Sequence, residues 1–197
     1  MSLIAGIRPG QKVLDVCAAP GGKSLSAAFA MAGNGSIVAC DLHENKLKRI
    51  QESADRLGVD IITTQAAAGR IFCPEWEAGF DAVLVDAPCS GLGIIRKKPD
   101  TRYKKADDLF TLPVIQSAIL DNAARYIRPG GTLVYSTCTI LPEENEQVTQ
   151  AFLAEHTDFT MSPIELPQPV GTTSGALTLW PQRHDTDGFY ICRMTRR

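Results

Sequence analysis

Two of the six cysteines, Cys89 and Cys138, stand where a thiol could do chemistry. Cys89 follows an apolar run that ends at Asp86, and Cys138 follows another that ends at Ser136. A thiolate can act as a nucleophile or a metal ligand, but the sequence has no C-x-x-C pair and its histidines are scattered. We therefore expect no metal and take the two thiols as candidates for covalent catalysis.

A glycine-containing turn after the first apolar run could bind a nucleotide-like ligand. It consists of Cys17, Ala18, Ala19, Pro20, Gly21, Gly22 and Lys23. Small residues allow a ligand to approach the backbone, and the following helix offers free amide groups. The end of the turn fits a phosphate-binding P-loop, but Cys17 stands at the position of the first required glycine. This mismatch disfavours a nucleoside triphosphatase. Asp41 ends the second apolar run, where a carboxylate suits the ribose of NAD or S-adenosylmethionine.

Apolar runs alternate with amphipathic stretches along the chain, which predicts an α/β fold with a parallel sheet between helices. Strands are expected at residues 12–16, 36–40, 60–64, 80–85 and 132–136, with weaker signals at 159–161 and 188–194. Helices are expected at residues 23–32, 45–57 and 113–126 and from Pro142 onward, and residues 163–180 are expected to be mostly loop. Ligands bind beyond the carboxyl ends of such strands, so both thiols and both carboxylates should border one pocket.

Together these motifs resemble the RNA 5-methylcytosine methyltransferases, the family of the bacterial Sun/Fmu and the eukaryotic NOL/NOP/Sun proteins. The resemblance is carried by residues 17–23, 86–89, 136–138, 142–145 and 187–190. It implies a Rossmann-like S-adenosylmethionine-dependent methyltransferase fold with a doubly wound, mostly parallel seven-stranded sheet. It also implies one catalytic domain over residues 1–197, without the N-terminal RNA-binding region of the family.

The resemblance assigns a role to each candidate residue. Carbon 5 of cytosine is a poor nucleophile until a thiolate adds to carbon 6, and the cysteine that adds in this family matches Cys138. Cys89 matches the cysteine that assists elimination, and Asp86 matches the residue that polarises the flipped base and borders the cofactor. We expect Lys23 to lower the pKa of a cysteine. Residues 17–23, Asp41 and Asp86 are expected to bind S-adenosyl-L-methionine.

A basic segment directly follows the Asp-Ala-Pro-Cys motif. Its six cationic residues are Arg96, Lys97, Lys98, Arg102, Lys104 and Lys105. We expect it to bind RNA phosphates beside the flipped base, although a solvated charged loop is the alternative. Its Pro-Asp-x-x-aromatic pattern resembles the Sun/Fmu branch, which implies ribosomal RNA as the substrate, and a transfer RNA substrate remains open.

One departure from the family pattern keeps a different function open. Family members usually carry an acidic residue at the third strand end, where this chain has Ala68. A catalytically silent module that binds RNA or cofactor is therefore an alternative, although both cysteines favour an enzyme. An amino methyltransferase is disfavoured because Cys89 stands where those enzymes place an aromatic residue that stacks on the base.

The overall composition fits an ordinary folded domain and does not itself indicate a nucleic-acid binder. The 197 residues are 44% hydrophobic and 21% charged, with a formal net charge of −2. The sequence shows no secretion signal, and its apolar runs are shorter than the ~20 residues that span a bilayer. We expect a cytoplasmic monomer that does not bind membranes.

Overall fold

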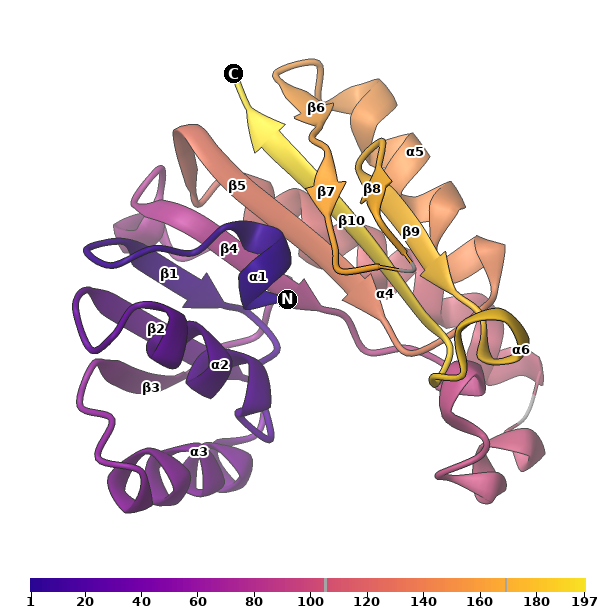
Figure 1. Ribbon diagram of the computed structural model, residues 1–197, viewed down its shortest axis with the longest axis horizontal. Helices are drawn as coiled ribbons and strands as arrows, with labels where there is room; N and C mark the ends of the chain where they lie inside the picture. The colour runs from indigo at the N-terminus through magenta and orange to yellow at the C-terminus, as the bar shows by residue number, and fades with distance from the viewer. Residues whose placement is uncertain (105, 169) are drawn as a thin grey trace.

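A twisted, mostly parallel sheet runs through the computed structural model, which describes residues 1–104, 106–168 and 170–197 (Figure 1). The spatial order of its strands is β3 (Ile62–Ala66), β2 (Ser36–Asp41), β1 (Lys12–Asp15), β4 (Phe80–Asp86), β5 (Ile127–Thr137), β10 (Phe189–Arg196) and β6 (Phe159–Met161). The five strands from β3 to β5 pair in parallel, and β10 is antiparallel to β5. β9 (Ala176–Leu179) also pairs with β10 and makes the sheet eight-stranded among the described residues. The predicted doubly wound α/β fold is confirmed, but the predicted count of seven strands is wrong, because β9 pairs with β10 from a stretch expected to be loop.

Helices cover both faces of the sheet (Figure 1). They are α1 (Ser2–Ala5), α2 (Gly22–Ala30), α3 (Glu44–Arg56), α4 (Ala106–Ala124), α5 (Glu146–Glu155) and α6 (Pro181–His184). Successive residues of a strand point to opposite faces, so Val83 packs in one core cluster with residues of α4 and α5, and Leu84 packs in another with residues of α1, α2 and α3. Burial on both faces explains why the sequence of β4 is nearly all apolar.

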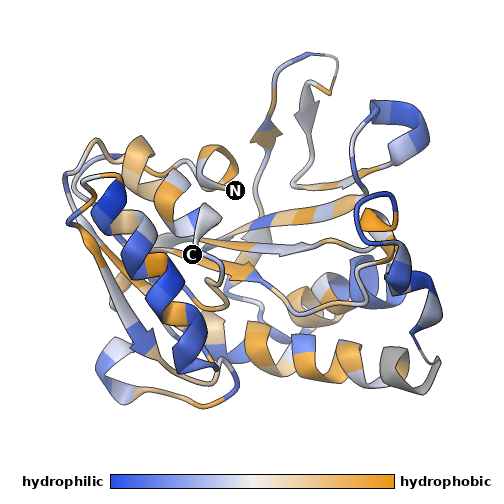
Figure 2. Cartoon of the chain, turned by 90° about the horizontal axis from the view of Figure 1, so that it is seen from below, coloured by the Kyte–Doolittle hydropathy of each residue, from blue (hydrophilic) through white to orange (hydrophobic). Residues whose placement is uncertain are grey.

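Helix α3 shows how the amphipathic pattern matches the fold. Leu47, Ile50 and Ala54 are buried at helical spacing, while most of the other residues of the helix are exposed. In Figure 2 this helix is mostly hydrophilic and is interrupted by hydrophobic turns on one side. Within the described part of the chain, no helix is long and apolar enough to cross a membrane.

Several boundaries differ from the sequence prediction, such as β5, which begins five residues earlier than expected, and the largest differences lie in α4 and in residues 163–180. Helix α4 begins at Ala106, seven residues before the predicted start, and continues through Pro113. The prediction placed this proline at the first helical position, where its missing N–H is harmless, but tertiary packing retains the helix on both sides of it. The expected loop at residues 163–180 contains β7 (Ile164–Glu165), β8 (Thr172–Thr173) and β9. The first two strands are too short to give a periodic signal.

Candidate active site

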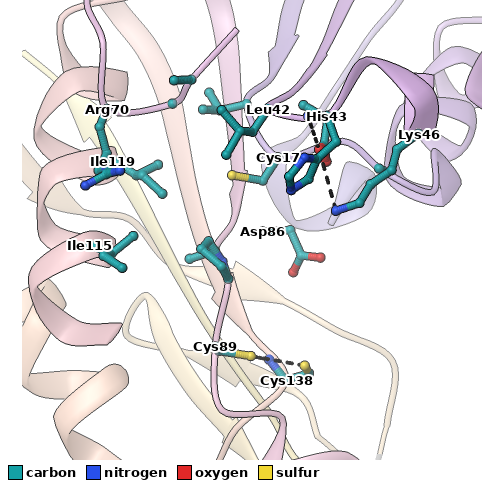
Figure 3. Close-up of a pocket in the computed structure, with 17 residues that line it drawn as sticks. Cys17, Leu42, His43, Lys46, Arg70, Asp86, Cys89, Ile115, Ile119 and Cys138 are labelled. Atoms are coloured by element: carbon teal, nitrogen blue, oxygen red, sulfur yellow. Dashed lines mark hydrogen bonds and ion pairs between the residues drawn. The ribbon is translucent and has the colours of Figure 1, made fainter. Parts of the chain in front are cut away.

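A pocket of about 490 Å³ lies at the carboxyl ends of β1, β2, β4 and β5. It is lined by Val16, Cys17, Ala19, Asp41, Leu42, His43, Lys46, Ala68, Gly69, Arg70, Asp86, Ala87, Pro88, Cys89, Ile115, Ile119 and Cys138. Figure 3 shows Asp86 between the cysteine pair and the residues at the ends of β1 and β2. In residues 1–104, 106–168 and 170–197, no group of three or more His, Cys, Asp or Glu residues could hold a metal ion.

The Sγ atoms of Cys89 and Cys138 lie 3.1 Å apart in this pocket (Figure 3). The backbone N–H of Cys138 also donates to the Cys89 Sγ over 3.3 Å. Donation from the Cys89 thiol lowers the pKa of Cys138 to about 7, although burial and Asp86 act in the opposite direction. The same thiol contact, together with burial, raises the pKa of Cys89. Cys138 is therefore the thiol that ionises first.

Asp86 is held by partners from two other elements. Lys23, in the first turn of α2, forms an ion pair with it, and the Ser136 hydroxyl at the end of β5 donates to its Oδ1 over 2.8 Å. Lys23 also favours ionisation of Cys138, but its effect on that pKa is smaller than the effect of the Cys89 thiol. Asp86 and Lys23 were predicted from the sequence as site residues, but the Ser136 contact and the dominant effect of the Cys89 thiol on the pKa of Cys138 were not.

The predicted cofactor turn borders the pocket at one edge. Cys17 and Ala19 line the pocket, whereas Ala18 is buried in the core. Gly21 has a φ of +105°, and a Cβ atom there would lie 3.1 Å from the Ile50 side chain. The turn therefore packs closely on α3 while its other side faces the pocket. The two remaining residues of the turn, Pro20 and Gly22, are exposed.

Asp41, at the end of β2, lies on the pocket wall as predicted from its strand-end position. Its Oδ1 accepts a hydrogen bond from the His43 N–H at 3.0 Å and lies 3.8 Å from the Lys46 Nζ. His43 and Lys46 line the pocket, although neither was predicted from the sequence as a site residue. Their positions two and five residues after Asp41, the strand-end carboxylate, were the available signal.

Two stretches outside the predicted motifs complete the pocket. Ala68, Gly69 and Arg70 line it after β3. The position expected to carry an acidic residue therefore borders the pocket, but it carries the methyl side chain of Ala68, and the guanidinium of Arg70 follows two residues later. Ile115 and Ile119 contribute an apolar wall from α4. These two isoleucines are four residues apart on a helix and read in the sequence as ordinary core positions.

Much of the basic segment contacts protein groups. Arg96 and Lys97 both pair with Asp187, a carboxylate whose side chain is 4% exposed, at 3.6 Å and 2.5 Å. Lys104 turns back toward the pocket, where its Nζ donates to the Ser90 carbonyl oxygen over 2.6 Å. This hydrogen bond therefore helps to fix the segment that carries Cys89.

The other basic residues divide into three cases. Arg102 donates to the Pro99 carbonyl oxygen over 3.2 Å within the short helix η3 (Pro99–Tyr103). Lys98 is exposed. Lys105 lies outside the described residues. Contact of this segment with RNA remains a prediction.

Comparison with known proteins identifies relatives along almost the whole chain. The family model described as 16S rRNA methyltransferase RsmB/F matches residues 3–195. A probable ribosomal RNA small subunit methyltransferase B of Bacillus subtilis is 46% identical over 194 residues, covering 95% of this chain and 43% of the relative. The crystal structure of NSun6 from Pyrococcus horikoshii with SFG has a TM-score of 0.85 at 28% identity, covering 99% of this chain and 50% of that one.

A further solved structure gives the same architecture. A methyltransferase homolog protein from Pyrococcus horikoshii has a TM-score of 0.81 at 32% identity, covering 98% of this chain and 64% of that one. The described chain thus spans less than half of the Bacillus relative, although almost all of its own length is matched.

Proposed function

Because the chain belongs to the 16S rRNA methyltransferase RsmB/F family, we propose that it transfers a methyl group from S-adenosylmethionine to carbon 5 of a cytosine in ribosomal RNA. The observation that carries this proposal is the pair of thiols 3.1 Å apart, supplied by the segments after β4 and β5. A methyltransferase whose substrate attacks the methyl group through an amino nitrogen or an oxygen needs no such pair of thiols. Two thiols with unequal tendencies to ionise suit a reaction that needs one nucleophile and one group for elimination.

The residues of the pocket fit S-adenosylmethionine. A volume of about 490 Å³ lies in the range of small-molecule sites. Asp41 offers carboxylate oxygens to ribose hydroxyls, and the backbone at Cys17 and Ala19 can approach the ligand closely because the neighbouring side chains are small. When bound, the cofactor supplies the methyl group.

The protein residues divide the reaction into addition and elimination. The Cys138 thiolate adds to carbon 6 of a cytosine flipped out of its stack, and carbon 5 becomes nucleophilic enough to accept the methyl group. Asp86, oriented by Lys23 and Ser136, hydrogen-bonds the base and polarises it. Cys89, as a thiolate, then takes the proton from carbon 5. The electron pair of that bond re-forms the double bond between carbons 5 and 6, and the bond from carbon 6 to sulfur breaks to release the Cys138 thiolate.

The decisive experiment is covalent trapping of RNA. Cys89→Ala, incubated with 16S ribosomal RNA and S-adenosylmethionine, should leave a complex that survives denaturing electrophoresis, and adding Cys138→Ala should abolish it. The reaction is run above pH 8, because loss of the Cys89 thiol raises the pKa of Cys138. Cys73→Ala serves as the control thiol outside the pocket. No trapped RNA with the single variant, or trapping that persists in the double variant, would overturn the assignment of the two cysteines. Trapping of transfer RNA but not of ribosomal RNA would replace ribosomal RNA as the proposed substrate.

A silent binding module is the second candidate, and Ala68 is the observation that favours it. Ala68 lines the pocket where the family usually has an acidic residue. One lost hydrogen bond costs ~1 kcal/mol, a several-fold loss of affinity. Isothermal titration with S-adenosylmethionine tests this observation, because undetectable binding supports a silent module. If binding is micromolar, transfer of labelled methyl groups to ribosomal RNA distinguishes the enzyme from a module that binds cofactor without catalysis.

A further inference from the structure

Glu144 and Asn145 are consecutive residues that hold the two cysteine-bearing segments, one each. They lie at the end of the short helix η4 (Pro142–Glu144), where the chain turns into α5. Both are buried, at 1% and 0% exposure, and neither lines the pocket or touches a reacting atom in the mechanism above. Their Pro-Glu-Glu-Asn sequence contributed to the family resemblance but has no role in the proposed chemistry.

Glu144 holds the segment around Cys89 from both sides. Its Oε2 accepts the Ser90 backbone N–H over 2.8 Å. The same oxygen accepts the Gln116 Nε2 over 2.8 Å, and that amide also donates to the Pro88 carbonyl oxygen over 2.9 Å. The residues before and after Cys89 are therefore both fixed to one buried carboxylate, directly or through one amide.

Asn145 holds the segment around Cys138 in the same manner. Its Oδ1 accepts the Thr137 hydroxyl over 2.5 Å, and its Nδ2 donates to the Thr139 carbonyl oxygen over 3.1 Å. The two segments are joined to each other by the Ser90 hydroxyl, which donates to the Thr139 hydroxyl over 2.7 Å. Two consecutive residues of one turn thus fix the residues on both sides of each cysteine.

Glu144 is itself fixed to the sheet. The Tyr135 hydroxyl, fully buried within β5, donates to the Glu144 carbonyl oxygen over 2.7 Å. A rigid anchor is needed because the residues on either side of Cys89 lie beyond the end of β4, outside any helix or strand. A hydrogen bond between thiols weakens steeply with distance, and a displacement of ~1 Å at a reacting group can cost ~10²-fold in rate.

We propose that Glu144 and Asn145 are positioning residues that set the distance between the Cys89 and Cys138 thiols. Their catalytic consequence rests on the proposed function, but their effect on the thiols does not. Among the described residues the Glu144 Oε1 and the Gln116 Oε1 are buried without a hydrogen-bond partner, so Glu144 acts through its Oε2, which accepts both bonds. Loss of either side chain therefore separates the thiols and removes the donation that favours the Cys138 thiolate.

The test measures alkylation of Cys138 by iodoacetamide against pH in the full chain, with the modified peptide quantified by mass spectrometry. We expect Glu144→Ala to raise the pH midpoint by about one unit and so lower the rate at pH 7 by ~5-fold. The sign is diagnostic. Removing a nearby carboxylate acts electrostatically in the opposite direction and lowers the midpoint. Glu144→Gln, whose amide oxygen can accept the same two bonds but which carries no charge, should give a midpoint at or slightly below that of the wild type.

Glu143→Ala is the matched control, because it removes the same side chain from the adjacent, exposed position. An unchanged or lowered midpoint in folded Glu144→Ala, or an equal rise in Glu143→Ala, overturns the proposal. If Glu144→Ala fails to fold, Asn145→Ala decides alone through the other segment, with the same expected rise. Covalent RNA trapping is scored separately, so absence of trapping with an intact alkylation result counts against the proposed function and not against this inference.

Discussion

Lys23 and Asp86 form an ion pair that connects the predicted cofactor turn after β1 to the end of β4. The Ser136 hydroxyl holds the other oxygen of Asp86. The carboxylate therefore has a fixed orientation, and Figure 3 shows it between the cysteine pair and the residues at the ends of β1 and β2.

Asp86→Asn should reduce kcat/KM for RNA methylation by ~10²-fold, because removing one fixed polar contact to the reacting group typically costs ~10²–10³-fold. The measurement is transfer of labelled methyl groups to ribosomal RNA under steady-state conditions. Asp81→Asn is the matched control, since Asp81 lies near the opposite end of the same strand and pairs with Arg128. Equal loss in both variants would indicate a general effect on the sheet and contradict a local role for Asp86.

Cys89→Ala should shift the ionisation of Cys138 upward. The Cys89 thiol is the largest influence that lowers the pKa of Cys138 from 9.0 to about 7, and burial opposes it. Alkylation of Cys138 should therefore show a midpoint near pH 7 in the wild type and near or above pH 9 in the variant. Cys73→Ala, which changes a thiol hydrogen-bonded to Glu75, should leave the profile unchanged. A midpoint that does not move would contradict the unequal ionisation of the two thiols.

Asp15 should make stability fall as pH rises from about 4 to 6. Burial is the main cause that raises the pKa of this carboxyl from 3.8 to about 6, against a hydrogen bond from Ser24. In that window the folded state binds more protons than the unfolded state, so the free energy of unfolding decreases with pH, by up to about 3 kcal/mol.

Denaturant unfolding at several pH values checks this. Asp15→Asn cannot ionise and should lack the decrease, so its stability relative to the wild type should improve between pH 4 and pH 7. Asp60→Asn, at an exposed position, should keep the wild-type trend. Parallel pH profiles for the wild type and Asp15→Asn would rule out the effect.

The strand ends were predictable from the sequence because they depend on local patterns. The apolar run at Phe80–Asp86 predicts a buried strand, and the parallel topology then brings Asp41, Asp86 and both cysteines to one edge. Helix α3 was predictable for the same reason, since its apolar spacing lies within one segment of chain.

Contacts between distant segments could not be predicted in this way. The bracket formed by Glu144 and Asn145 depends on hydrogen bonds to residues up to 54 positions away, and none of these leaves a periodic signal. Lys104 reads in the sequence as one more cation of a basic segment, although it donates back to the Ser90 carbonyl oxygen. Strand β9 forms against β10 by long-range pairing, which local propensity does not encode.

Asp187→Asn should increase the salt dependence of RNA binding. Asp187 neutralises Arg96 and Lys97, whose side chains are otherwise largely exposed at 62% and 70%. Each cation released to a phosphate steepens the slope of log Kd against log salt by ~0.7 for single-stranded RNA. Fluorescence anisotropy with a single-stranded RNA oligonucleotide between 50 and ~200 mM salt measures it. Asp185→Asn, which removes an exposed carboxylate near Arg96, is the control, and an unchanged slope in Asp187→Asn would show that these cations do not reach RNA.

Gly93→Ala should disturb Cys138 through the backbone alone. The Gly93 N–H donates to the Cys138 carbonyl oxygen over 3.0 Å, and the Gly93 carbonyl oxygen accepts the Gly188 N–H over 2.8 Å. A Cβ atom on Gly93 would overlap the Gly188 carbonyl and lie 2.9 Å from the Cys138 carbonyl oxygen, so backbone has to move. Overpacking of this kind costs ~1–3 kcal/mol, and we expect slower alkylation of Cys138 at pH 7 in the same variant.

Thermal unfolding without ligand measures the stability loss, with Gly22→Ala as the control. A Cβ atom on Gly22 would meet no atom within 4 Å, so that variant should unfold at the wild-type temperature or slightly above it, as expected for alanine at a helix start. If Gly93→Ala is as stable as Gly22→Ala and its Cys138 reacts at the wild-type rate, the close approach of Gly93 and Gly188 does not support the Cys138 segment. If Gly93→Ala is stable but its Cys138 is alkylated more slowly, the contact between Gly93 and Gly188 positions the Cys138 thiol without contributing to stability.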